Sequence, residues 1–229
     1  MRRLHHFIFG LFFGLTVGFA QAGALDAISS GDASAGVKEA LAKGADYAVA
    51  SLGKSGGFLG NDKVKIRLPG YLDKADSALR MFGMGKQADQ LVETMNRAAE
   101  NAVAEAKPIL TESIKKMSIK DAKDILTGGD DSVTQYFKRT STEQLTAKFM
   151  PIVKNETKKL SLADQYNKFA GKAASAGLVD KQNADVDSYV TQKAMDGLFL
   201  MIAEEEKKLR ANPMGAGSEL LGKVFGALN

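Results

Sequence analysis

The side chains that most enzymes use for catalysis are almost missing from this chain beyond its first 22 residues. Both histidines, His5 and His6, lie in that opening segment, and the 229 residues include no cysteine and no tryptophan. If the segment is removed on export, a Ser-His-Asp triad and a Cys-His pair are both excluded. Zinc, copper and non-haem iron also lose the nitrogen and sulfur ligands that they prefer. Oxygen ligands, Ser-Lys pairs and carboxylates are left.

One stretch begins like a calcium-binding loop. Asn183, Asp185 and Asp187 have the spacing of the first three ligands of such a loop. The loop needs Gly at its sixth position and Glu at its twelfth, but Ser188 and Ala194 occupy those positions here. We therefore interpret Asp185 or Asp187 as the N-terminal cap of a helix. No metal site and no cofactor are expected.

Two pairs, Ser51-x-x-Lys54 and Ser113-x-x-Lys116, have the spacing of a serine nucleophile activated by lysine. Penicillin-recognising enzymes add separate Ser-Asp-Asn and Lys-Thr-Gly elements, which this chain lacks. Carboxylate pairs can hydrolyse glycosides, but the aromatic residues that would stack on sugars are thinly spread. We expect a protein that is not an enzyme. The alternative is an envelope hydrolase that uses carboxylates, Lys or Tyr.

The most unusual polar cluster is the run from Met95 to Glu100. On a helix, Asn96 and Glu100 share a face, and Arg97 follows Glu93 by one turn. Polar residues that flank an Ala-rich apolar stripe can form a partly buried network, which fixes a packing register or lines a pocket. Glu205, Glu206 and Arg210 near the end of a later helix can meet this network.

The elements that must position these residues are helices. Apolar residues recur mostly at helical spacing, and four prolines interrupt the pattern. This predicts an all-α single domain of about seven to nine helices, with one Gly-rich irregular loop near residues 54–70. The expected helices cover residues 34–52 with Gly53 as the terminator, 71–82, 86–117 with a kink at Pro108, a short segment with Ser118 as its N-cap, a segment after Asp130 or Asp131, 142–160 with a capping box that starts at Thr140 or Ser141, 162–176, 185–210 and 218–228.

The opening segment is typical of a secretory signal peptide. Arg2 and Arg3 precede an apolar run over residues 7–20, and Ala20-Gln21-Ala22 is a small-x-small cleavage site. We expect cleavage after Ala22, a single helical domain over residues 23–229, no transmembrane anchor after cleavage, and a periplasmic or secreted protein. Loss of two arginines lowers the net charge from +4 to +2. Because the remaining Lys and Arg are dispersed among acids, nucleic acid is not an expected partner.

Several of these segments together resemble an uncharacterised family of exported bacterial helical proteins, the domain of unknown function 4197. The similar stretches are Gly56-Gly57-Phe58, Lys65-Ile66-Arg67-Leu68-Pro69, Met95 to Glu100, Asp121-Ala122 with Ile125-Leu126-x-Gly128, Thr134-x-Tyr136-Phe137, Gly197-Leu198-Phe199, and Glu205-Glu206 with Arg210. The resemblance implies an exported all-α domain and brings no activity, cofactor or catalytic residue.

From the helical cluster and these stretches we select candidates for a ligand site or a buried polar network. They are Asn96, Arg97, Glu100, Tyr136, Glu205 and Arg210, with Gly56, Gly57 and Phe58 as loop candidates. The expected function is that of an exported helical protein that binds an unknown envelope protein or an apolar small molecule. An envelope scaffold or oligomer is a further alternative.

Overall fold

The computed structural model describes residues 29–69, 85–158 and 185–213, together with residues 80, 81, 83, 163, 164, 166–168, 171, 175, 219, 220 and 224. Within this part the chain forms six α-helices and no strand, so the predicted all-α class is confirmed. The helices are α2 (Ser30–Leu52), α4 (Gly85–Ala104), α5 (Lys107–Lys115), α6 (Ile119–Thr127), α7 (Ser132–Thr157) and α9 (Val186–Ala211). The expected signal peptide and most of the helices expected over residues 71–82, 162–176 and 218–228 lie outside the described residues.

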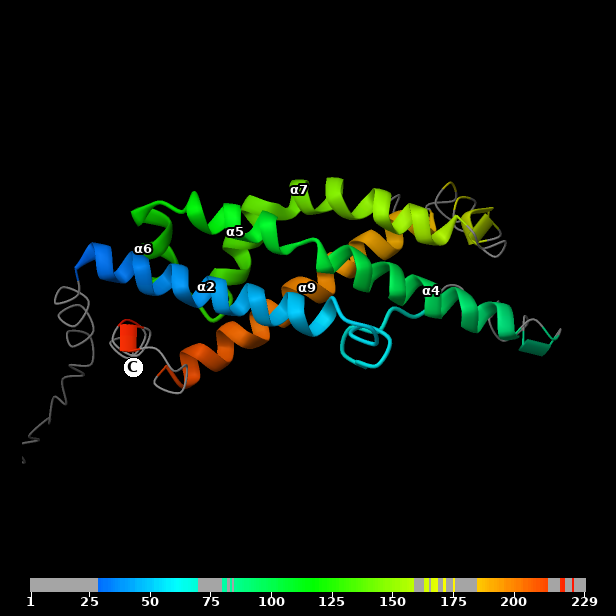
Figure 1. Ribbon diagram of the computed structural model, residues 1–229, viewed down its shortest axis with the longest axis horizontal. Helices are drawn as coiled ribbons and strands as arrows, with labels where there is room; N and C mark the ends of the chain where they lie inside the picture. Colours follow the sequence, from blue (N-terminus) through cyan, green and yellow to red (C-terminus); the bar gives the residue numbers. More distant parts are fainter. Residues whose placement is uncertain are drawn as a thin grey trace, which may run out of the picture.

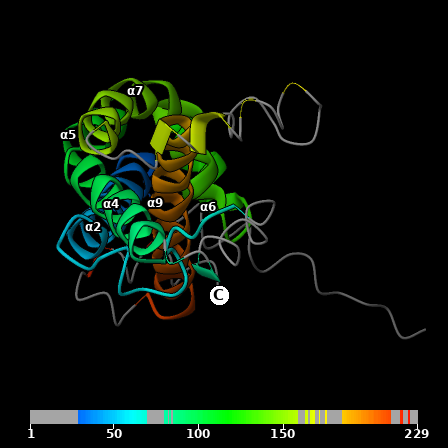
Figure 2. The same ribbon diagram turned by 90° about the vertical axis from the view of Figure 1, so that its right-hand side faces the viewer.

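Helix α9 lies in the middle of an elongated bundle. It packs against α2, α4 and α7, and α4 also packs against α7. In Figure 1, α7 runs along one side, α2 and α4 follow one another along the other, and α9 crosses between them. Figure 2 shows the same bundle along its length, with α9 among the other helices. All six helices contribute buried apolar side chains to a single cluster. No helix in the described part is both long and apolar enough to cross a lipid bilayer.

Helix α2 is bounded by the signals that its sequence carries. At its start, the Ser29 side chain accepts a hydrogen bond from the Asp32 N–H at 3.0 Å. It ends at Gly53, the predicted terminator, whose N–H donates to the Val49 carbonyl. A Cβ at Gly53 would lie 2.9 Å from the Cα of Ala104. The end of α2 therefore touches the end of α4, and glycine permits this close approach.

The expected long helix over residues 86–117 is wrong in one respect, because it is two helices. The N–H of Glu105 donates to the Ala102 carbonyl, and that of Ala106 to the Val103 carbonyl, so tight turns close α4. Pro108 then stands in the first turn of α5. A proline there leaves no hydrogen bond unmade, because first-turn N–H groups have no partner within the helix. The chain thus restarts a helix at Pro108 and does not kink.

The expected boundary near residues 140–142 is also wrong, since α7 runs without a break from Ser132 to Thr157. The Thr140 hydroxyl does not cap a new helix. It donates to the Tyr136 carbonyl one turn back, at 2.8 Å. A Thr hydroxyl can make that bond from the interior of a helix, so the capping pattern alone does not place an N-terminus. Pro151 lies inside the same helix.

Candidate functional site

Asn96 holds the irregular segment that joins α2 to the following part of the chain. Its side chain is fully buried on α4. Its Oδ1 accepts from the Ile66 N–H at 2.8 Å, and its Nδ2 donates to the Ile66 carbonyl at 2.8 Å and to the Val92 carbonyl at 2.7 Å. The amide thus pairs both backbone groups of Ile66, as a neighbouring strand would. Those two groups would otherwise be buried without partners.

Glu100, one turn further along α4, holds the same segment at a second point. Its Oε1 accepts from the Phe58 N–H at 3.0 Å and from the Leu59 N–H at 3.2 Å, and its side chain is buried. The structure therefore brings Asn96 and Glu100 together on the face that points toward residues 53–69. We call these two residues the loop anchor.

The three loop candidates are packed against the bundle. Gly56 has a φ of 76°, in the left-handed region that glycine adopts without strain. A Cβ at Gly57 would lie 2.4 Å from the Leu52 carbonyl oxygen, so only glycine fits there. Phe58 is fully buried, and its ring would be 2.7 Å from a Cβ placed on Gly197 of α9. The glycines thus let the chain turn so that Phe58 enters the core.

Glu206 and Arg210, both on α9, form a second buried polar network. Glu206 accepts from the backbone N–H groups of Val133 and Thr134 at 2.9 and 3.1 Å, and from the Thr134 hydroxyl at 3.2 Å. Arg210 donates to Glu206 through Nε and Nη2, and its Nη2 also donates to the Ile125 carbonyl at 2.9 Å. We call Glu206 and Arg210 the helix clamp.

The helix clamp completes the start of α7. Asp131, the residue at the cap position, makes no side-chain cap hydrogen bond, so Glu206 supplies the acceptor from α9. Burial raises the pKa of Glu206, and hydrogen bonds from Val133, Thr134 and Arg210 oppose that rise without cancelling it. A cavity of about 10 Å³, enough for one water molecule, adjoins Glu206 and Gly44.

Two candidates lie outside these networks. Arg97 is 63% exposed and pairs with Glu93 at 3.1 Å on the surface of α4. Glu205 pairs with Lys208 at 3.1 Å, also within one helix. Its neighbour Glu206 is named with Glu205 in the sequence analysis but is not among the selected candidates, and Glu206 is the acid that binds Arg210. The sequence indicates that Glu206 is buried by its position on the apolar stripe of α9. It follows Ile202 by four residues and Leu198 by eight, and both of these are fully buried. The clamp pairs with α6 and α7 and not with Asn96.

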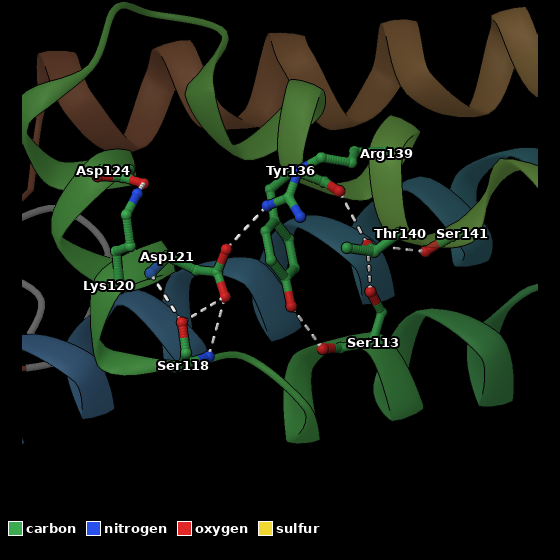
Figure 3. A network of polar contacts seen from close by, with 9 residues as sticks. All are labelled: Ser113, Ser118, Lys120, Asp121, Asp124, Tyr136, Arg139, Thr140 and Ser141. Carbon is green, nitrogen blue, oxygen red and sulfur yellow. Dashed lines mark hydrogen bonds and ion pairs between the residues drawn. The ribbon is translucent and has the colours of Figure 1, made fainter.

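Tyr136 joins α7 to α5, as Figure 3 shows. Its hydroxyl donates to the Ser113 carbonyl at 2.7 Å, and burial raises the pKa of the phenol. The Ser113 hydroxyl is hydrogen-bonded to that of Thr140. Lys116 points elsewhere, because it pairs with Glu112 at 3.4 Å and is 68% exposed. The Ser113-x-x-Lys116 spacing therefore does not produce a serine activated by lysine.

Beside Tyr136, a capping box fixes the start of α6 (Figure 3). Ser118 and Asp121 exchange hydrogen bonds between side chain and backbone at 3.0 and 3.1 Å, which confirms Ser118 as the predicted cap. Arg139 of α7 pairs with Asp121 at 2.8 Å and lies over the Tyr136 ring. The Ser118 hydroxyl, followed by its N–H and by Arg139, lowers the pKa of Asp121.

The cap interpretation of the calcium-like stretch is confirmed for Asp185. Its side chain accepts from the Ser188 N–H at 2.8 Å at the start of α9. Asp187 accepts a hydrogen bond from the Thr157 hydroxyl. Among the described residues, no three His, Cys, Asp or Glu side chains are grouped so that they could hold a metal ion.

A cleft of about 510 Å³ lies between the loop and the first half of α4. Its described lining consists of Leu59, Lys65, Arg67, Leu68, Arg80, Asp89, Val92 and Glu93. The loop anchor fixes the wall, because Glu100 binds the Leu59 N–H and Asn96 binds the Val92 carbonyl. Its size is within the range of small-molecule sites, roughly 300–1,000 Å³. The two residues of the loop anchor thus fix the backbone of residues that line the cleft.

Comparison with known proteins gives one match. The model of a family described as "protein of unknown function (DUF4197)" matches residues 27–226. No curated protein matches the chain, and no solved structure does.

Proposed function

The chain belongs to the DUF4197 family, and we propose that it is an exported, non-enzymatic protein of the cell envelope that binds a partner or an apolar small molecule. We further propose that the cleft between the loop and α4 is the binding site. The observation that carries this proposal is the fixed wall of the cleft. Two buried side chains of α4, those of Asn96 and Glu100, hold the loop in place. The hollow of about 510 Å³ remains between these side chains and the solvent.

The positions of the buried acids support a binding role over catalysis. Glu100 and Glu206 are the two buried carboxylates of the described chain, and each accepts two backbone N–H groups. A carboxylate that satisfies backbone donors contributes to the fold, and moving a proton through it would weaken those hydrogen bonds. The same reasoning applies to Tyr136, whose hydroxyl proton is donated to the Ser113 carbonyl.

Native mass spectrometry of the protein isolated from its own envelope fraction tests this proposal. We expect a polypeptide mass that corresponds to residues 23–229, accompanied by a bound species. Val92→Phe would fill the cleft from α4 and should abolish the bound species. Leu200→Phe is the matched control, because Leu200 is exposed on α9 and does not line the cleft. A wild-type spectrum without any bound species contradicts the binding role, and retention by Val92→Phe contradicts the cleft as its site.

A further inference from the structure

The charges that line the cleft are unevenly matched. Its two described carboxylates both have cationic partners, since Asp89 pairs with Arg80 at 2.8 Å and Glu93 with Arg97 at 3.1 Å. Lys65, by contrast, forms no ion pair with any described acid, although its side chain is half-buried at the cleft.

Arg67, the second cation from the loop, is only weakly compensated. It meets Asp62 at 3.4 Å, and both side chains are largely exposed, at 69% and 92%. Such a pair contributes little free energy in water and is easily exchanged for another anion. The backbone at Arg67 is nevertheless fixed, because its carbonyl accepts from the Tyr189 hydroxyl at 2.9 Å. The loop wall therefore carries two positive charges that are available to a ligand.

Apolar side chains accompany these cations. Leu59 and Leu68 come from the loop, and Val92 comes from α4, and all three are partly exposed in the cleft. Transfer of a ligand's apolar surface onto these side chains is favourable, at roughly 25 cal/mol per Å². The lining thus combines an apolar area with positive charge that is at most weakly compensated.

We infer that the cleft binds a small amphipathic anion, whose acidic group lies beside Lys65 and Arg67 and whose apolar body covers Leu59, Leu68 and Val92. This inference rests on the proposed binding function and specifies the chemistry of its ligand. A carboxylate, sulfonate or phosphate group fits the two cations, since Arg and Lys donate charge-assisted hydrogen bonds to each of them. A neutral apolar molecule would use the leucines and the valine, and would leave Lys65 without an ion pair and Arg67 with only its exposed pair to Asp62.

Two fluorescent probes with the same ring system test the inference. Anilinonaphthalene sulfonate is an apolar anion, and N-phenylnaphthylamine is its counterpart without the sulfonate. Titrated at low salt into folded protein that lacks residues 1–22, the sulfonate should bind about five- to tenfold more tightly than the neutral probe, which is the effect of one or two partly exposed ion pairs. The difference should shrink as salt is added.

Two lysine variants test whether the sulfonate group of the probe lies beside Lys65. Lys65→Gln should weaken the sulfonate about fivefold and leave the neutral probe unchanged. Lys54→Gln, an exposed lysine of the same segment that does not line the cleft, should change neither. Equal affinity for the two probes, or an unchanged sulfonate affinity in Lys65→Gln, would overturn the inference and leave the binding function intact. Failure of both probes to bind would overturn the amphipathic ligand class, whereas the bound species from the envelope tests the binding function separately.

Discussion

Glu206 and Arg210 give the sharpest test of the stabilising role assigned to the buried networks. The change is a double-mutant cycle of Glu206→Leu, Arg210→Met and the combined variant. Loss of Glu206 leaves Arg210 in the core, only 13% exposed, without its carboxylate. It also leaves the Val133 and Thr134 N–H groups without their acceptor.

The expected change in the free energy of unfolding follows from these contacts. Removal of one partner of a buried ion pair costs about 3–5 kcal/mol, and loss of a helix cap about 0.5–2 kcal/mol. Glu206→Leu should therefore lower the free energy of unfolding by about 4 kcal/mol. In the double variant no buried charge is left alone, so it should be less destabilised than the sum of the single variants by about 2 kcal/mol.

Urea denaturation followed by far-UV circular dichroism measures all four proteins, and it suits a helical chain without tryptophan. Glu205→Ala is the matched control, because Glu205 forms a surface pair within α9 and its loss should change the free energy by less than about 0.5 kcal/mol. If the single effects simply add, or if Glu205→Ala costs as much as Glu206→Leu, the reasoning about the helix clamp is refuted.

Three further predictions follow from local geometry. Asn96→Ala should lower the free energy of unfolding by about 2–4 kcal/mol, because two buried backbone groups of the loop lose their partner. In the same urea assay, the control Arg97→Ala should change the free energy of unfolding by less than about 0.5 kcal/mol. The Ser118 capping box lowers the pKa of Asp121 in the folded state, so its stabilisation is present above the unfolded pKa and is lost as pH falls through the folded pKa. Wild type should therefore exceed Asp121→Ala by about 1 kcal/mol at neutral pH, with the difference vanishing in acid; a difference that persists in acid contradicts this. Gly44→Ala should add about 0.5–1 kcal/mol and raise Tm in calorimetry, since a Cβ there meets no atom within 4 Å and alanine favours the helix.

The helical class could be predicted from the sequence because each long helix repeats apolar residues at the helical period. The ends of α2, α6 and α9 were also predictable, since Gly53, Ser118 and Asp185 are strong local signals. The end of α4 before Pro108 and the continuity of α7 through Thr140 were not predictable. A proline suits both a kink and a first turn, and a threonine hydroxyl suits both a cap and a helix interior, so packing decides between them.

The candidate site shows the same division between local and tertiary information. Asn96 and Glu100 were found because their spacing places them on one face of a helix. Glu205 and Glu206 were both named, but only Glu205 was selected as a candidate, because the choice between adjacent acids depends on which of them faces α7. The cleft depends on a loop and a helix that lie apart in the chain and meet where Ile66 binds Asn96 and where Phe58 and Leu59 bind Glu100. No local pattern encodes that meeting.

The central claim is that α4 uses its buried polar residues to hold the loop and leaves the cleft for a ligand. Amide chemical-shift mapping of isotope-labelled protein that lacks residues 1–22, titrated with anilinonaphthalene sulfonate, tests it most directly. We expect the largest shifts at the amides of Leu59, Lys65, Leu68 and Val92. The amides of Tyr136 and Glu206 should not shift. Shifts centred on α6 and α7, with the cleft unchanged, would contradict it.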